Sequence, residues 1–243
     1  MKDIIIIGAG GVGKEVTFII EQINKVKPTW NILGIIDDNK KLHGSTINGY
    51  IVSGDFKYLD KYSNEISKPE LIVAIADYNT KKGIVKKLNN KFKFATIIHP
   101  DVQVHNTTKI GEGSIIYNGV IMTTNITIGN HVLISPKCGI GHDSILKDYV
   151  SLLWNVNISG KDIIEEGAFI GSASTIIQGK RIGQGSIIGA GAVVIEDVLS
   201  NTTNVGVPSK TIKIMKSIKQ VGWNKESINR GVYDEKDIVY NNS

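Results

Sequence analysis

The chain has 243 residues and a formal net charge of +5, and 41% of its residues are hydrophobic. This composition is typical of a globular protein with one large domain or two modest ones. The positive charge is mild and dispersed, without a basic cluster interleaved with aromatics, so we expect no nucleic-acid partner. No apolar run reaches the length of a membrane helix, so we expect no membrane insertion. The single cysteine, Cys138, cannot form an internal disulfide, which favours the cytoplasm.

Strands and helices are predicted to alternate over the first part of the chain, which favours a small parallel sheet of about four strands. We expect strands over residues 2–7, 31–36, 70–76 and 94–98, and helices over 14–24 and for about a dozen residues after 76. The turn after the first strand carries Gly8, Gly10, Gly11 and Gly13, and Asp37-Asp38 follows the second strand. Such a turn lets backbone N–H groups approach a phosphate, and an acid further on can hydrogen-bond ribose.

Two other interpretations of the glycine turn stay open. Taken alone, it would suggest a nicotinamide-dependent dehydrogenase, but no second mononucleotide-binding half follows the expected strands. The glycines could also do no more than permit close packing of helix and strand in a docking domain.

The second half of the chain repeats every six residues. Seventeen consecutive positions at this spacing, which we call markers, are aliphatic or Met, from Ile98 to Val194. Small residues, Cys138 among them, lie two positions before many markers. Glycines cluster just after the markers, where we expect corners to need a permissive backbone. A strict period of six fits neither a helix nor simple alternation, and it predicts a hexapeptide β-solenoid with Cys138 packed in its core.

His142 is the candidate catalytic residue. It lies two residues after the marker Ile140, and a coil of eighteen residues would stack Gly160 over it. The open space beside its ring suits a general base that takes a proton from an acceptor amine or hydroxyl. The N–H of Gly160 could face the developing oxyanion. Asp143 could orient the imidazole, although neighbours on an extended strand point to opposite faces. The alternative is that His142 is only a polar corner residue.

A metal site is not expected. His99 and His105 occupy equal phases on successive faces rather than one column, while His131 and His142 differ in phase. Three ligands would therefore have to converge from different subunits.

Five motifs in order resemble the sialic acid O-acetyltransferase and bacterial amino-sugar N-acetyltransferase family. They are the glycine-rich start, Asp37-Asp38, residues 97–100 (Ile-Ile-His-Pro), residues 141–143 (Gly-His-Asp) and residues 205–210 (Val-Gly-Val-Pro-Ser-Lys). The resemblance implies a homotrimer with active sites between protomers. It implies a Rossmann-like α/β domain over residues 1–95, which binds a nucleotide sugar, and a left-handed parallel β-helix over 96–210. Residues 211–243 would form a tail, and 211–220 a short helix that caps the coil.

The resemblance also implies a role for each matching residue. His142 would be the base and Asp143 its acidic neighbour. The nucleotide would be held by Gly10, Gly11, Val12, Gly13, Asp37 and Asp38, with Ser135 near the acceptor. Acetyl-CoA would lie between adjacent β-helices, near Ser151, Gly160, Ser172, Ala190, Val207 and Pro208. Val12 and Ser151 replace histidines, and Ser135 an asparagine, that relatives often carry.

The expected activity is therefore transfer of acetyl from acetyl-CoA to the amine of a nucleotide-linked sugar, in the synthesis of a bacterial surface polysaccharide or glycan. One alternative is O-acetylation of a sugar hydroxyl, on sialic acid or a capsular sugar. Another is a non-catalytic scaffold that binds a sugar nucleotide, which the openly stacked His142 argues against.

Overall fold

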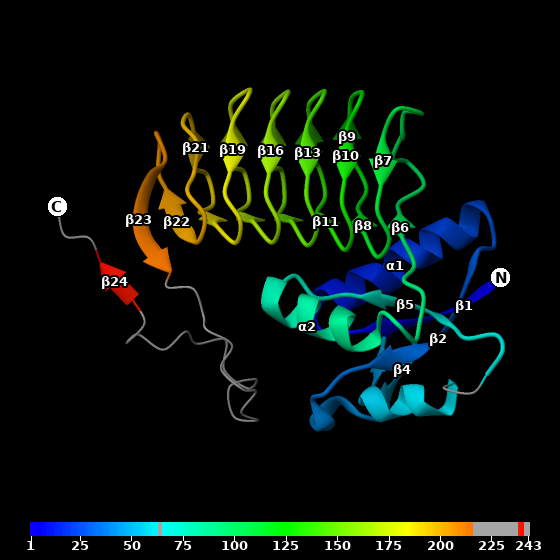
Figure 1. The fold of residues 1–243 in the computed structure, drawn as a ribbon. Coiled ribbons are helices and arrows are strands. Elements are labelled where there is room, and N and C mark those ends of the chain that lie inside the picture. Colours follow the sequence, from blue (N-terminus) through cyan, green and yellow to red (C-terminus); the bar gives the residue numbers. More distant parts are fainter. Residues whose placement is uncertain (63–64, 216–237, 241–243) are drawn as a thin grey trace.

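The computed structural model describes residues 1–62, 65–215 and 238–240, and it consists of an α/β domain packed against one side of a long coil (Figure 1). The elements of the α/β domain are β1 (Lys2–Ile7), α1 (Gly11–Val26), β2 (Trp30–Ile36), η1 (Lys40–Leu42), β3 (Thr46–Ile47), β4 (Tyr50–Gly54), η2 (Phe56–Tyr62), β5 (Glu70–Val73) and α2 (Tyr78–Leu88). The sheet order is β3-β4-β2-β1-β5, parallel except for the β3–β4 hairpin.

The run of four isoleucines in β1 is buried on both faces of this sheet. Ile4 and Ile6 pack in the cluster that includes residues of α1, whereas Ile5 and Ile7 pack in the cluster that includes residues of α2. Successive side chains of a strand point to opposite faces, so a strand covered by helices on both sides is apolar throughout.

The predicted strand over 94–98 does not belong to this sheet. Phe94 makes only an isolated bridge to Leu71, and Ile97–Ile98 form β6, which pairs with a strand of the coil. The sheet nevertheless has five strands rather than the expected four. The additional strands are the short β3–β4 hairpin, which was not predicted. The strand predicted over 70–76 ends at Val73.

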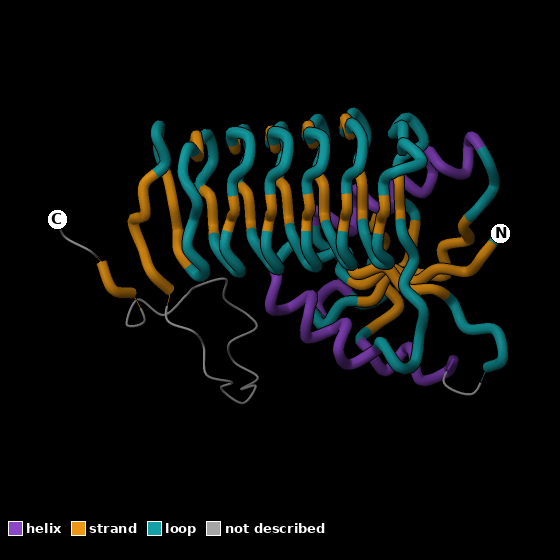
Figure 2. The backbone as a smooth tube through the Cα atoms, turned by 45° about the horizontal axis from the view of Figure 1, so that its top comes forward, coloured by secondary structure: helices purple, strands orange, loops and turns teal. Residues whose placement is uncertain are grey.

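The coil is a three-sided parallel β-helix built from two-residue strands (Figure 2). The first face holds β6 (Ile97–Ile98), β8 (Ile115–Ile116), β11 (Leu133–Ile134), β14 (Ser151–Leu152), β17 (Phe169–Ile170) and β20 (Ile187–Ile188). The second face holds β9 (Ile121–Met122), β12 (Gly139–Ile140), β15 (Asn157–Ile158), β18 (Thr175–Ile176) and β21 (Val193–Val194). The third face holds β7 (Lys109–Ile110), β10 (Thr127–Ile128), β13 (Ile145–Leu146), β16 (Ile163–Ile164) and β19 (Arg181–Ile182).

The six-residue pattern is confirmed. Every marker from Ile110 to Val194 is the second residue of a two-residue strand, and the strands of each face pair in register with those eighteen residues away. The exception is Val104, which lies outside any strand and is 42% exposed. The small residues two positions before the markers are inside the coil. Cys138 is fully buried there and donates from Sγ to the carbonyl oxygen of Leu153 at 2.9 Å.

The prediction that the glycines after the markers occupy corners with a permissive backbone is wrong. Gly129 and Gly141 do not have a positive φ. A Cβ on either would lie 2.6–2.8 Å from backbone atoms of the next coil. These glycines permit close stacking of coils rather than a turn. The left-handed corner residue comes two positions later, at residues 113, 119, 125, 131, 137, 143, 149, 155, 161, 167, 173, 179, 185 and 191.

The coil ends in a hairpin rather than a helix. β22 (Thr202–Val205) pairs with β20, and β23 (Lys210–Met215) runs antiparallel to β22 and pairs with β24 (Ile238–Tyr240). The helix predicted over 211–220 is therefore wrong for residues 211–215, and its remainder lies outside the described residues. The strand satisfies backbone groups that the last coil would otherwise leave unpaired. We retain the limits 1–95 and 96–210 as proposed domain boundaries, with β23 extending the second domain.

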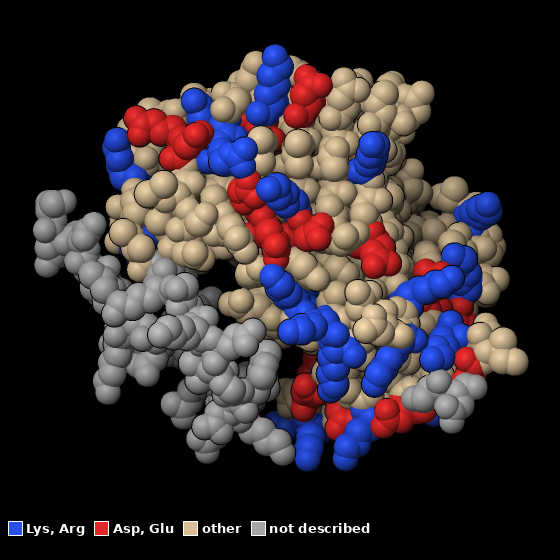
Figure 3. Space-filling view, in the orientation of Figure 1, with Lys and Arg blue, Asp and Glu red and all other residues tan. Residues whose placement is uncertain are grey.

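The α/β domain covers the start of the first face. Ile97, Ile115 and Leu133 of the coil share one apolar cluster with the domain's own core. Polar contacts line the border: Tyr117 Oη donates to Glu15 at 2.8 Å, and Tyr78 Oη donates to Glu166 at 2.8 Å. Lys82 of α2 also pairs with Glu166, and Lys147 pairs with Glu165 within the coil. Figure 3 shows acidic and basic side chains interleaved on this side of the molecule. No described helix is long and apolar enough to cross a membrane.

Asp162 is a charged residue in the small inward column, and it gives a pH-dependent prediction. Its side chain is fully buried; Oδ1 accepts the N–H of Lys180 at 2.7 Å, while Oδ2 has no hydrogen-bond partner among the described residues. Burial raises the pKa of Asp162 to about 6, against backbone N–H donation that lowers it. A carboxyl whose pKa is raised on folding destabilises the folded state only where it would ionise. The loss of stability is absent below the unfolded pKa of 3.8 and fully present above about 6.

We therefore expect the change in the free energy of unfolding caused by Asp162→Asn to be more stabilising at pH 7.5 than at pH 4, by at most roughly 3 kcal/mol. Urea unfolding of both proteins at both pH values measures this, and any pH-independent cost of the amide cancels in the double difference. An effect of the substitution that is equal at the two pH values would contradict it.

Candidate active site

His142 and Asp143 form a hydrogen-bonded pair at a corner between the second and third faces, which we call the second–third edge. Nδ1 of His142 lies 2.7 Å from Oδ2 of Asp143, and the two side chains are 48% and 43% exposed. Asp143 occupies the left-handed corner position, with φ of 61°. This backbone turn lets neighbouring side chains meet, which an extended strand would not allow.

The contact between His142 and Asp143 determines which imidazole nitrogen carries the hydrogen. The pKa of Asp143 is lowered, first by the hydrogen bond with His142 and then by one from Asn125. An ionised carboxylate can only accept, so Nδ1 of His142 carries the hydrogen and Nε2 of the neutral ring is left as a base. Asn125, one coil earlier, was missed by the sequence analysis.

The predicted stacking of Gly160 against His142 is present. A Cβ on Gly160 would lie 2.6 Å from Nε2 of the ring. The coils are joined here by a 2.7 Å hydrogen bond from Lys161 N–H to the carbonyl oxygen of His142. The glycine thus makes room for the imidazole, whose side chain is 48% exposed.

Ser151 and Ser135 do not lie at the His142 corner. Ser151 is on the first face, 1% exposed, and its Oγ donates to the carbonyl oxygen of Ala76 at 3.0 Å. Ser135 follows β11 on the same face and is 6% exposed. Within this chain, Ser151 therefore faces the α/β domain, close to the end of the sheet that carries the glycine turn.

The other residues expected near acetyl-CoA lie at a different corner of the coil. Ser172 and Ala190 occupy one column at the corner between the first and second faces, joined by a 2.8 Å hydrogen bond from Gly191 N–H to Ser172 O. Trp154, 50% exposed, stands in the same column one coil earlier. Val207 and Pro208, linked by a cis peptide bond, lie in the turn between β22 and β23.

The glycine turn contains two kinds of glycine. A Cβ on Gly13 would overlap the carbonyl oxygen of Gly8, so Gly13 serves the packing of α1 on β1. Gly10 and Gly11 have no atom within 4 Å of a Cβ position, and both are exposed at the N-terminus of α1. They leave an open approach to the helix N-terminus, which attracts anions such as phosphate. Val12 packs partly against the apolar core.

Asp37 and Asp38 differ in their surroundings. Oδ2 of Asp37 accepts the N–H of Ala9, and Oδ1 accepts the N–H of Asn39, both at 2.8 Å. Asp37 therefore ties the glycine turn to the loop after β2. Asp38 is exposed, and its pKa is raised, mainly by partial burial of the carboxyl and against the attraction of Lys87.

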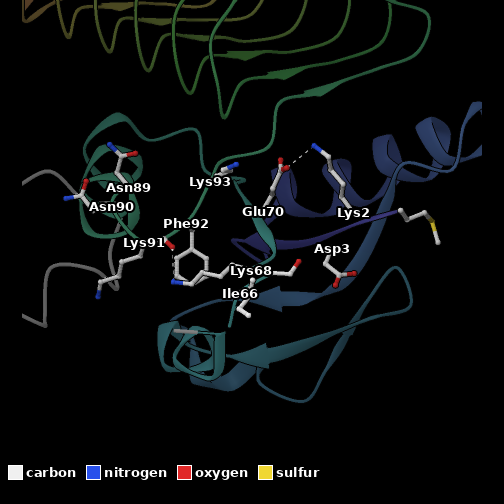
Figure 4. A pocket seen from close by; sticks show the side chains of 12 residues that line it. Lys2, Asp3, Ile66, Lys68, Glu70, Asn89, Asn90, Lys91, Phe92 and Lys93 are labelled. Atoms are coloured by element: carbon white, nitrogen blue, oxygen red, sulfur yellow. Dashed lines mark hydrogen bonds and ion pairs between the residues drawn. The ribbon is translucent and has the colours of Figure 1, made fainter. Parts of the chain in front are cut away.

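Two other features lie apart from these residues. A cavity of about 720 Å³ opens where β1 and β5 begin, at the opposite edge of the sheet from the glycine turn (Figure 4). Two pairs of its lining residues are joined, Lys2 with Glu70 at 3.0 Å and Lys68 Nζ with the carbonyl oxygen of Lys91 at 3.4 Å. Among the described residues, no group of three or more His, Cys, Asp or Glu side chains could hold a metal ion.

A histidine–aspartate pair on a hexapeptide β-helix, in a chain whose α/β domain carries an open glycine turn, is the arrangement expected of a sugar acyltransferase. Comparison with known proteins agrees. Residues 3–88 match the PglD N-terminal domain family. The chain is 33% identical over 193 residues to GDP-perosamine N-acetyltransferase of Escherichia coli O157:H7, covering 76% of this chain and 82% of that protein.

Solved structures show the same architecture. A mutant perosamine N-acetyltransferase from Caulobacter crescentus, in complex with CoA and GDP-perosamine, has a TM-score of 0.80 at 27% identity, covering 87% of this chain and 97% of that one. The acetyltransferase domain of PglB from Neisseria gonorrhoeae, in complex with acetyl coenzyme A, has a TM-score of 0.78 at 26% identity, covering 86% and 98%. The chain belongs to the family of hexapeptide-repeat sugar acetyltransferases that includes these PglD-like and perosamine N-acetyltransferases.

Proposed function

We propose that this protein transfers the acetyl group of acetyl-CoA to the amine of a nucleotide-linked amino sugar, with His142 as general base. The observation that carries the proposal is the 2.7 Å contact between His142 and Asp143, which leaves Nε2 free beside Gly160. The amine attacks the thioester carbonyl, a C–N bond forms and the C–S bond breaks. His142 takes the proton from the amine and returns it to the CoA thiolate.

The choice of an amine over a hydroxyl comes from the relatives, since the two perosamine N-acetyltransferases named above match most of the length of this chain. An O-acetyltransferase would use the same base, so the acceptor must be tested. For the nucleotide we propose Gly10, Gly11 and Asp38, because these groups are open at the end of the sheet, while Asp37 holds the loops together.

The two halves of the proposed site lie on opposite sides of one chain. The α/β domain covers the first face, whereas His142 stands at the second–third edge, the one edge that does not border that face (Figure 1). A sugar held by the domain would have to span the coil to reach its own chain's His142. We therefore propose a homotrimer in which the second–third edge of one protomer faces the α/β domain of the next.

Acetyl-CoA would then lie between two β-helices. Gly160 of one protomer and the Ser172–Ala190 column of its neighbour would line it, which explains why these residues occupy different edges of one chain. Trp154 extends that column with an exposed ring. A buried cysteine without a disulfide suits the cytoplasm, where we place the reaction, in the synthesis of a surface polysaccharide or glycan.

The test is a thiol-release assay with acetyl-CoA and a panel of GDP-, UDP- and dTDP-linked amino sugars, with the matching hydroxy sugars as controls. We expect turnover with one amino sugar, an amide product by mass spectrometry and a trimeric mass in solution. Turnover only with a hydroxy sugar would overturn the N-acetylation assignment, and a stable monomer with full activity would overturn the shared site. Stabilisation by NADH alone would favour the dehydrogenase alternative.

A further inference from the structure

The left-handed corner residues of successive coils stack along the second–third edge. At eighteen-residue intervals they are Asn125, Asp143 and Lys161, with φ of 57°, 61° and 62°. Thr107 precedes them at the same interval. Each coil therefore presents one side chain to the next at the corner where His142 stands.

Asp143 is held from two directions. Its Oδ2 contacts Nδ1 of His142 at 2.7 Å, and its Oδ1 accepts a hydrogen bond from Nδ2 of Asn125 at 3.2 Å. An exposed carboxylate held at one oxygen can still rotate about its last side-chain bond. Engagement of the second oxygen from the coil before removes that freedom. The positive charge of Lys161, in the coil after, also favours the ionised form of Asp143.

Asn125 is anchored in turn. Its backbone N–H donates to Oγ1 of Thr107 at 2.8 Å, and that hydroxyl lies 2.9 Å from Nδ1 of His105. Since the N–H of Thr107 also donates to this Nδ1 at 3.3 Å, the nitrogen is an acceptor and the hydroxyl donates to it. A continuous chain of hydrogen bonds thus runs from His105 through Thr107, Asn125 and Asp143 to His142.

We propose that Asn125 is a positioning residue that fixes the carboxylate of Asp143 so that His142 keeps its hydrogen on Nδ1 and presents Nε2 to the acceptor. The inference rests on the proposed function of His142 as the base. An amide suits this place because it donates without charge, whereas a carboxylate would repel Asp143.

The matched test is Asn125→Gly, with Asn155→Gly as its control. Both asparagines occupy left-handed corners, with φ of 57° and 58°, so glycine keeps the backbone at each. Only Asn125 contacts the pair. We expect Asn125→Gly to lower kcat roughly tenfold with KM for both substrates unchanged, less than the roughly 10²-fold that a 1 Å misplacement can cost. We expect Asn155→Gly to have no effect and Asn125→Asp not to restore activity.

A second measurement does not depend on the reaction. Nitrogen-15 NMR of histidine-labelled protein reports which imidazole nitrogen carries the hydrogen. We expect His142 to hold it on Nδ1 in the wild type and to show a mixture of tautomers in Asn125→Gly. An unchanged tautomer would overturn the inference, as would an unchanged kcat in an active enzyme. If no sugar is acetylated at all, the proposed function fails, and the NMR comparison still decides the role of Asn125.

Discussion

Replacing His142 with alanine is expected to lower kcat by about 10²- to 10⁴-fold, the usual contribution of a positioned general base. KM for acetyl-CoA and for the nucleotide sugar should stay near the wild-type values, because the ring is proposed to move a proton rather than to hold either substrate. The side chain is 48% exposed, so its loss should leave the coil intact. Steady-state kinetics with the acceptor found in the substrate panel measures the effect.

The same experiment needs a variant that keeps the shape of the ring's polar edge. His142→Asn supplies one, and it should be as impaired as alanine, since an amide cannot accept the proton. Thermal unfolding of both variants with and without acetyl-CoA would show that the site still binds. Wild-type turnover in either variant would remove His142 from the chemistry and leave the scaffold alternative in its place.

The coil was predictable because its signal is periodic and strong. An inward aliphatic every sixth residue is required wherever a two-residue strand meets a narrow core, so the register from Ile110 to Val194 could be predicted directly. The corners could not, because the left-handed position accepts several residue types. Asn125, His131 and Tyr149 share it with glycines. The conspicuous glycines mark a different constraint, the close approach of coils, which only coordinates reveal.

The α/β domain was less predictable in its details. The hairpin β3–β4 is short, and Ile47 and Val52 are its only buried apolar side chains, so it carries no clear pattern. Ile97 and Ile98 were given two assignments, as the end of the strand predicted over 94–98 and, with Ile98 as the first marker, as part of the coil. Only the coil assignment agrees with the observed strand pairing. An apolar pair predicts a strand but not its partner, and here the partner is β8 of the coil.

The sequence identified His142 and Asp143 as candidate site residues, but it did not show which contacts hold the pair in place. Asp143 was expected to be able to orient the imidazole, although neighbours on an extended strand point apart, and its positive φ is what brings the two side chains together. The contact of Asn125 spans eighteen residues, so it depends on the coil register rather than on any local motif. Likewise, Ser151 has nothing in its sequence neighbourhood to show that Ala76 covers it.

Gly160→Ala is expected to reduce kcat/KM by roughly 10²-fold, because the imidazole would have to move by nearly 1 Å. The added Cβ would lie 2.6 Å from Nε2, 2.8 Å from Cε1 and 3.0 Å from Cδ2 of His142, whereas ordinary contacts begin near 3.4 Å. Gly160 does not have a positive φ, so alanine adds no backbone strain, and the loss should appear in activity rather than stability. Gly139→Ala is the matched control, since its Cβ would meet one atom, of Asn157, at 3.5 Å.

A double-mutant cycle decides whether this effect passes through the imidazole. If Gly160 acts by seating His142, then Gly160→Ala should cost nothing more once His142 is already alanine, and the two losses will be strongly non-additive. Kinetics of the double variant measures this directly. Losses that multiply would show that Gly160 acts through its proposed place beside acetyl-CoA rather than by seating the imidazole of His142.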